Sequence, residues 1–129
     1  MIVRVLAGAL SINRTGFGVA HLMKPADASR SWIGRVARDP ATQVFIRGHG
    51  ARDLALGAGA LVALARRDDR GARVWLAGQA LADSADIVST LAARKRLPRQ
   101  GFRFALGMAA VSTAVATAAA AALGTRWSV

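Results

Sequence analysis

Long apolar stretches alternate with short polar ones along this chain. Four of them cover residues 2–23, 41–65, 73–93 and 102–123. A helix needs about 20 mainly apolar residues to cross the hydrocarbon core of a bilayer, and each stretch comes near that length. The pattern predicts an all-α fold. We expect an integral membrane four-helix bundle that forms a single transmembrane domain over residues 1–129.

Helix-breaking and capping residues separate these stretches. Pro25 ends the first stretch. Asp39 followed by Pro40 is a favourable helix start, because aspartate caps a helix and proline lacks the donor that would be unpaired there. The turn at 66–72 is short and polar, so the second and third helices should form an antiparallel hairpin.

The segment at 26–38 has a different pattern. Trp32, Ile33 and Val36 recur at helical spacing, and three arginines between and around them supply charge. This pattern favours a short amphipathic helix between the first and second helices, lying in the membrane interface with Trp32 at headgroup level. An ordinary polar loop is the alternative.

Composition favours a membrane protein over a nucleic-acid-binding one. Hydrophobic residues make up 53% of the chain, and the mean hydropathy is +0.32. The net charge of +11 comes largely from basic clusters between the apolar stretches, where anionic headgroups would neutralise them. Few aromatic residues are available to stack on bases, so we expect no nucleic acid partner. The expected partner is the lipid bilayer, and the expected location is multi-pass in the cell inner (plasma) membrane.

Charged residues inside the apolar stretches are the candidates for function. Asp83 and Asp86 lie three positions apart, so they share one face of the third helix near its middle. Ionisable groups at such depth are costly and mark functional sites by default. If the hairpin turns near residues 68 and 69, Arg52 and Asp53 fall at the depth of Asp83 and Asp86.

Three interpretations of this group stay open. In the first, Arg52 forms a buried structural ion pair with Asp83, with Asp53 as a further partner, and fixes the register of the helices. In the second, one carboxylate stays unpaired with a raised pKa, so that Asp83 or Asp86 acts as a catalytic acid or base or carries protons. In the third, the helices are offset and these side chains face headgroups.

Further polar residues complete the candidate binding group. Arg14, beside Asn13 in the middle of the first helix, needs a carboxylate, which one of the three aspartates can supply. His49 lies one turn before Asp53 and is a candidate proton relay or metal ligand, or an interfacial polar residue. The chain has no cysteine and no cluster of metal-ligating residues, so we expect no metal site and no cofactor.

Three segments carry a family resemblance. They are Gly-Ala-Arg-Asp-Leu-Ala-Leu-Gly at 50–57, Leu-Ala-Asp-Ser-Ala-Asp at 81–86 and the basic end at 93–98. The G-x-R-D-L-A-L-G and D-x-x-D segments resemble those of short, uncharacterised four-span membrane proteins common in high-GC bacteria, especially actinobacteria. The resemblance covers residues 30–98 and implies four helices but no known activity. It marks Arg52, Asp53, Asp83 and Asp86 for testing.

Three functions are compatible with this pattern. The leading interpretation is a small membrane protein whose polar intramembrane site binds or processes a lipid-like or other hydrophobic small molecule. The alternatives are a non-enzymatic accessory subunit of a larger membrane complex and a proton-coupled small transporter acting as a homo-oligomer. A binder or enzyme should have a cavity that reaches Asp83 or Asp86, whereas an accessory subunit should have those carboxylates fully paired. The sequence does not decide whether the protein is an enzyme.

Overall fold

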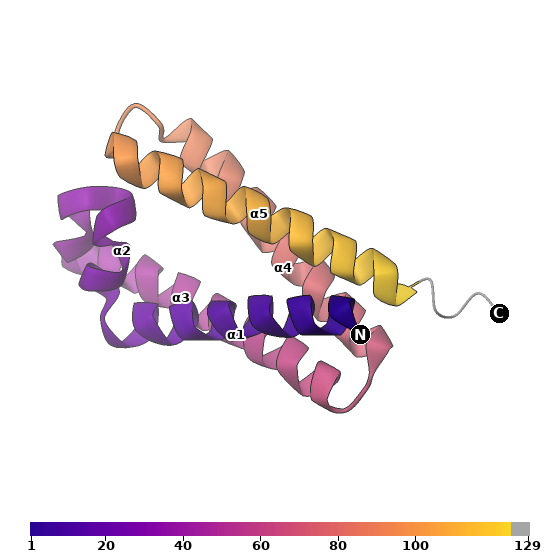
Figure 1. Ribbon diagram of the computed structural model, residues 1–129. Helices are drawn as coiled ribbons and strands as arrows, with labels where there is room; N and C mark the ends of the chain where they lie inside the picture. The colour runs from indigo at the N-terminus through magenta and orange to yellow at the C-terminus, as the bar shows by residue number, and fades with distance from the viewer. Residues whose placement is uncertain (125–129) are drawn as a thin grey trace.

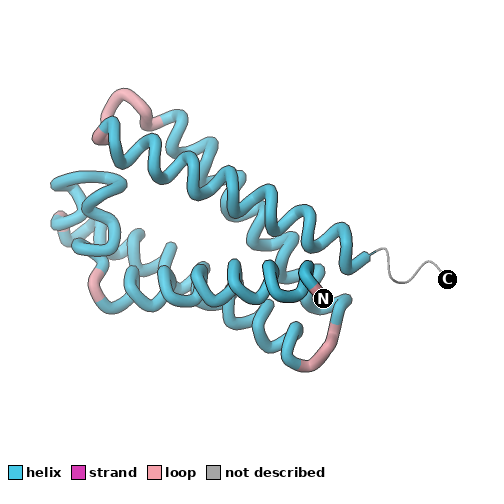
Figure 2. Tube along the Cα trace, in the orientation of Figure 1, coloured by secondary structure: helices cyan, strands magenta, loops and turns pink. Residues whose placement is uncertain are grey.

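The computed structural model describes residues 1–124, and these residues form an all-α fold (Figures 1 and 2). The last five residues of the predicted domain lie outside this range. The elements, in chain order, are α1 (Ile2–Met23), α2 (Pro25–Ile33), the 3-10 helix η1 (Gly34–Arg38), α3 (Pro40–Ala65), α4 (Asp69–Ala92) and α5 (Arg99–Gly124).

The four long helices run alternately in opposite directions, and α2 with η1 lies across one end of the molecule (Figure 1). α1 packs along α3, and α4 packs along α5. In Figure 1 the two pairs lie close together at the end that holds the N-terminus and diverge toward α2. The space between the pairs therefore widens toward α2, which is where the candidate site lies.

Glycines let the backbones of α1 and α3 touch. A Cβ atom added at Gly50 of α3 would lie 2.8 Å from the Cβ of His21 and 2.9 Å from the carbonyl oxygen of Gly18, both on α1. A real Cβ does not approach other atoms so closely, so any larger residue would separate the helices. This contact fixes the depth at which the polar side chains of α1 meet those of α3.

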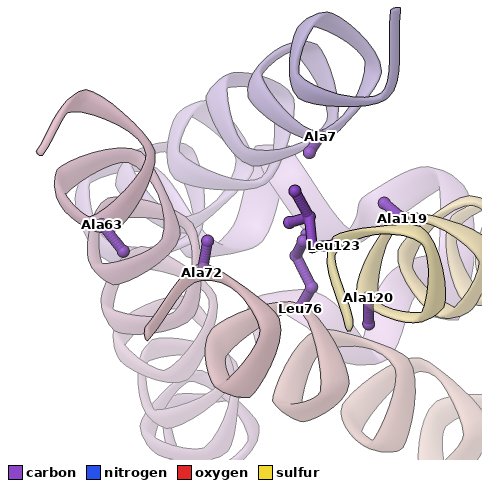
Figure 3. Packing of buried hydrophobic residues seen from close by; sticks show 7 residues of the cluster. All are labelled: Ala7, Ala63, Ala72, Leu76, Ala119, Ala120 and Leu123. Atoms are coloured by element: carbon purple, nitrogen blue, oxygen red, sulfur yellow. The ribbon is translucent and has the colours of Figure 1, made fainter. Parts of the chain in front are cut away.

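A small cluster of apolar residues closes the end of the bundle opposite α2 (Figure 3). Leu76 of α4 and Leu123 of α5 are fully or almost fully buried, and five alanines surround them: Ala7, Ala63, Ala72, Ala119 and Ala120. At the same end Arg4 of α1 forms an ion pair with Asp69, the first residue of α4. Small side chains allow the four helices to converge here, so the bundle is tight at this end and open at the other.

Local sequence explains the segment that crosses the open end. Asp39 caps α3 by accepting a hydrogen bond from the backbone N–H of Thr42 at 2.7 Å. At Gly101 of α5 a Cβ atom would overlap the carbonyl oxygen of Ser31, so α5 and the end of α2 are in backbone contact. A short helix does occur between the first two long helices, but it packs on the bundle and Trp32 lines a cavity.

The predicted four-span membrane bundle is wrong. Among residues 1–124, only α5 is both long and apolar enough to cross a membrane, with a mean hydropathy of 1.8 over its most apolar 18 residues. Asn13 and Arg14 lower the hydropathy of α1, the polar first half of α3 does the same there, and Asp83 and Asp86 interrupt α4. A multi-pass location is therefore not supported, and α5 is the candidate membrane-spanning helix.

Polar groups gather inside the bundle beside the candidate site, and many large apolar side chains lie on its outer surface. Arg14, Asp53 and Asp83, counted as whole residues, are each no more than 7% exposed. Exposed apolar side chains occur on all four long helices, at Leu6, Phe45, Leu81 and Phe104 among others. Arginine and aspartate are rarely buried to this degree unless they are paired.

Candidate functional site

A cavity of about 160 Å³ lies between α1 and α5, with residues of α2, α3 and α4 in its walls. Its floor is polar and charged, and includes the buried side chains of Arg14 and Asp83. Its mouth is apolar, because Phe17, Phe104 and Met108 line the cavity and are 39%, 55% and 40% exposed. A cavity of this size holds a molecule of about one aromatic ring.

Arg14 links three helices at the floor. One guanidinium nitrogen donates to Asp53 of α3 at 2.8 Å, and the other donates to Asp83 of α4. The hydroxyl of Ser112 on α5 also donates to Asp83, at 2.5 Å. Arg14, Asp53 and Asp83 have side chains only 6%, 10% and 7% exposed, so these ion pairs are almost wholly withdrawn from water.

Arg52 forms a second, more accessible centre. Its guanidinium donates to both oxygens of Asp86, at 3.1 and 2.7 Å, which is the bidentate geometry that arginine favours. It also donates to Asp53 at 3.1 Å. Burial alone would lower the pKa of Arg52, but the hydrogen bonds and charges of Asp86 and Asp53 outweigh it and raise the pKa. Arg52 therefore stays charged while it holds α3 to α4.

The contacts of His49 identify its neutral form. Arg52 has only donors, so the Nδ1 atom of His49, 3.1 Å from that guanidinium, must be the unprotonated acceptor. The Nε2 atom, which then carries the proton, lies 3.5 Å from the carboxylate of Asp53. Burial lowers the pKa of His49 below its ordinary value of 6.5, against the opposing charge of Asp53. At neutral pH the ring therefore adds no positive charge.

Four rings follow one another along one wall of the cavity. Phe17 and His21 have ring centroids 6.2 Å apart, His21 and His49 are 5.3 Å apart, and His49 and Trp32 are 5.6 Å apart. All four residues line the cavity. His21 is fixed in place because its Nδ1 donates to the carbonyl oxygen of Phe17 at 2.7 Å. The wall is therefore a continuous aromatic surface beside the aspartates.

The structure brings six of the seven candidate residues into one connected group. Asp83 pairs with Arg14, not with Arg52, and Asp86 is the carboxylate that Arg52 clamps. Asp53 lies between the two arginines. Asn13 lines the cavity from an exposed position on α1. Each of these three aspartates has an arginine partner, so the unpaired carboxylate expected in the catalytic interpretation does not occur.

Sequence reasoning missed the contributions of Ser112, Trp32 and His21. Ser112 sits in an alanine-rich helix whose pattern gives no sign of which face points inward. Trp32 has the spacing of an interfacial residue, and only the fold of α2 over the bundle turns it to the cavity. His21 lies seven residues after Arg14, so its place on the same helix face was available as a signal.

Comparison with known proteins gives no relative. The chain matches no protein-family model, and no characterised protein and no solved structure is significantly similar to it. In the part of the chain that the structure describes, no three histidines, aspartates or glutamates are grouped so as to hold a metal ion. The chemistry of the site therefore has to be argued from its own residues. Its central feature is that each of the three carboxylates is held by an arginine.

Proposed function

We propose that the protein binds a lipid-like or other hydrophobic small molecule in the cavity between α1 and α5. The observation that carries this proposal is the combination of an apolar mouth at Phe104 and Met108 with a polar floor at Arg14 and Asp83. Small-molecule sites are typically concave and mostly apolar, with a few convergent polar groups. An amphipathic molecule meets both conditions when its polar group points to the floor.

We infer that the protein works in contact with lipid. The most apolar part of α5 is only 22% buried, whereas the core helix of a soluble protein would be mostly buried. Exposed apolar surface of this kind marks an interaction site or a membrane contact. Basic residues at the start of α5, including Arg99 and Arg103, suit anionic headgroups. A molecule dissolved in lipid would reach the mouth of the cavity directly from the bilayer.

The proposal is tested by blocking the cavity. Ala109 of α5 lines the cavity, and a phenyl ring placed there would occupy a large part of its 160 Å³. Its neighbour Ala110 is exposed and does not line the cavity, so Ala110→Phe is the matched control. We expect wild type and Ala110→Phe, purified in a mild detergent, to retain the same small molecule in native mass spectrometry. Ala109→Phe should lose it.

Two results would count against the proposal. One is equal retention by Ala109→Phe and wild type, which would place the molecule on the outer surface. The other is a wild-type protein that carries only detergent after extraction from membranes under several conditions.

An accessory subunit of a larger membrane complex is the second candidate. It is favoured by the pairing of Asp83 and Asp86 with arginines, which leaves no free carboxylate among them. In that case the exposed apolar faces would be covered by another protein rather than by lipid. Native mass measurement of gently extracted protein separates the two, because a subunit should carry a partner at fixed stoichiometry. A single chain or small homo-oligomer with bound small molecule supports the binding function.

A further inference from the structure

The charges at the floor of the cavity do not balance. Arg14 and Arg52 face three aspartates, Asp53, Asp83 and Asp86, so one negative charge is left over. His49 does not offset this charge, because burial lowers its pKa and its contacts identify the neutral ring. The cavity is thus locally negative although the whole chain carries a net charge of +11.

The surplus charge is reachable at Asp86. Its side chain is 23% exposed, compared with 10% for Asp53 and 7% for Asp83. Asp86 also lines the cavity. Each of its oxygens accepts one hydrogen bond from Arg52, and a carboxylate oxygen can accept two. One side of Asp86 is therefore free to face a bound group.

The aromatic wall favours the same sign of charge. Phe17, His21, His49 and Trp32 present a run of rings to the cavity, with adjacent centroids 5.3–6.2 Å apart. The faces of the phenyl ring of Phe17 and the indole ring of Trp32 carry partial negative charge and attract a cation, and tryptophan does so most strongly. Aromatic rings are the usual surroundings of a bound quaternary ammonium group, and here the carboxylate of Asp86 lines the same cavity.

We propose that the molecule in the cavity is an organic cation, an amine or quaternary ammonium amphiphile whose charged head lies between Asp86 and the aromatic wall. This inference rests on the proposed function, because it assigns the charge of the molecule that the cavity holds. The apolar part of the molecule lies at the mouth, against Phe104 and Met108.

Two other head groups fit the site less well. An anionic head would compete with three carboxylates for two arginines that already hold them. A neutral acceptor head would need free donors. The Nε–H of Arg14 and the indole N–H of Trp32 have no hydrogen-bond partner among the described residues, but both atoms are buried and have almost no exposed surface from which to donate.

Three small probes of nearly equal size test the sign of the charge. Phenyltrimethylammonium is the cation, tert-butylbenzene is its neutral isostere, and benzenesulfonate is the anion. Binding to the full chain in a non-ionic detergent is measured by isothermal titration calorimetry, with Ala109→Phe as the blank for binding outside the cavity. We expect phenyltrimethylammonium to bind at least tenfold more tightly than either of the other probes.

Asp86→Asn provides the second measurement. The substitution removes the surplus charge and keeps an acceptor for Arg52, which also retains Asp53. It should weaken phenyltrimethylammonium at least tenfold and leave tert-butylbenzene within twofold. If this variant does not fold, the order of the three probes on wild type still decides the question.

The outcomes separate this inference from the proposed function. Suppose that the probes bind and that Ala109→Phe abolishes this binding. If all three then bind equally, or benzenesulfonate binds more tightly, the cation assignment is overturned and the binding function is kept. If no probe binds in a way that Ala109→Phe abolishes, the cavity takes no ligand of this size and both proposals fail.

Discussion

Replacing Arg14 by methionine should cost much of the stability of the fold. Arg14 is 6% exposed and donates to Asp53 and Asp83. The variant keeps a flexible, unbranched side chain, although a shorter one, and removes its charge. Asp83 is then left in the interior with Ser112 as its remaining partner. Asp53 keeps Arg52 at 3.1 Å.

The size of the effect follows from counting the carboxylates that lose their only arginine. Asp83 does so and Asp53 does not. Removing one partner of a buried ion pair costs about 3–5 kcal/mol, and here that range applies once rather than twice. Domains of this size unfold with about 5–15 kcal/mol, so the loss is a large share of the total. The double variant Arg14→Met/Asp83→Leu removes the stranded charge and should recover at least about 2 kcal/mol, because apolar replacements of buried pairs are often neutral.

The assay is chemical unfolding in a mild detergent, monitored by far-ultraviolet circular dichroism. It is carried out on Arg14→Met, on Asp83→Leu and on the double variant. Arg47→Met is the matched control, because Arg47 is exposed and its side chain donates to Gln43 over a long 3.5 Å. Its unfolding free energy should stay within about 0.5 kcal/mol of wild type. The reasoning is refuted if Arg14→Met also stays in that range. It is equally refuted if the effects of the two single substitutions simply add in the double variant.

Two further predictions concern the framework around the site. Gly50→Ala would place a Cβ atom 2.8 Å from the Cβ of His21 and separate α1 from α3, so it should lower the unfolding free energy by about 1–3 kcal/mol. Gly48→Ala is the control and should not lower it, because a Cβ atom there would have no neighbouring atom within 4 Å. Equal thermal unfolding temperatures for the two variants would contradict the close contact. Asp39 accepts hydrogen bonds from the backbone and side chain of Thr42, which hold the pKa of Asp39 below its ordinary value of 3.8. Because the pKa of Asp39 is lower in the folded state, its carboxylate stabilises the fold at pH values above its unfolded-state pKa. Asp39→Ala should therefore be less stable than wild type at neutral pH, and this difference should vanish as the pH falls through the folded-state pKa. Asp39→Asn, which keeps the cap, should lose less at neutral pH, and a pH-independent difference between wild type and Asp39→Ala would rule out the carboxylate as its cause.

The register of the site could be predicted from the sequence because one short turn sets it. Two helices that leave the same turn rise equally per residue, so residues at equal distance from the turn lie level. This places Arg52 at the depth of both Asp83 and Asp86. In the structure it pairs with Asp86, at 2.7 Å, and not with Asp83 as the structural interpretation suggested. The partner of Asp83 could not be fixed in the same way. Arg14 reaches it from α1, and α2 and η1 separate α1 from the hairpin, so no single turn sets its depth.

The prediction of four membrane spans failed because average hydropathy does not record the direction in which each side chain points. The mean hydropathy of a chain has the same value whether its apolar side chains face the interior of the bundle or its outer surface. In this fold the polar groups of α1, α3 and α4 converge on one buried site, so each of those helices is less apolar than a spanning helix. The exposed apolar residues on the other faces of these helices lie outside that site. The number of long helices could therefore be predicted from the sequence pattern, whereas the number of membrane spans could not.

The buried charges also bear on why the site exists. A well-packed apolar core is often more stable than the ion pairs it replaces, so stability alone does not explain Arg14, Asp53 and Asp83. Two explanations are left, helix register and ligand binding, and Arg14→Met/Asp83→Leu distinguishes them. Register requires that this variant lose its unique fold. Binding requires that it stay folded, with retention of the molecule weakened because Arg14 and Asp83 no longer form the polar floor of the cavity. The open cavity beside these pairs favours the second explanation, because residues needed only for register would be expected to pack without leaving 160 Å³ at their side.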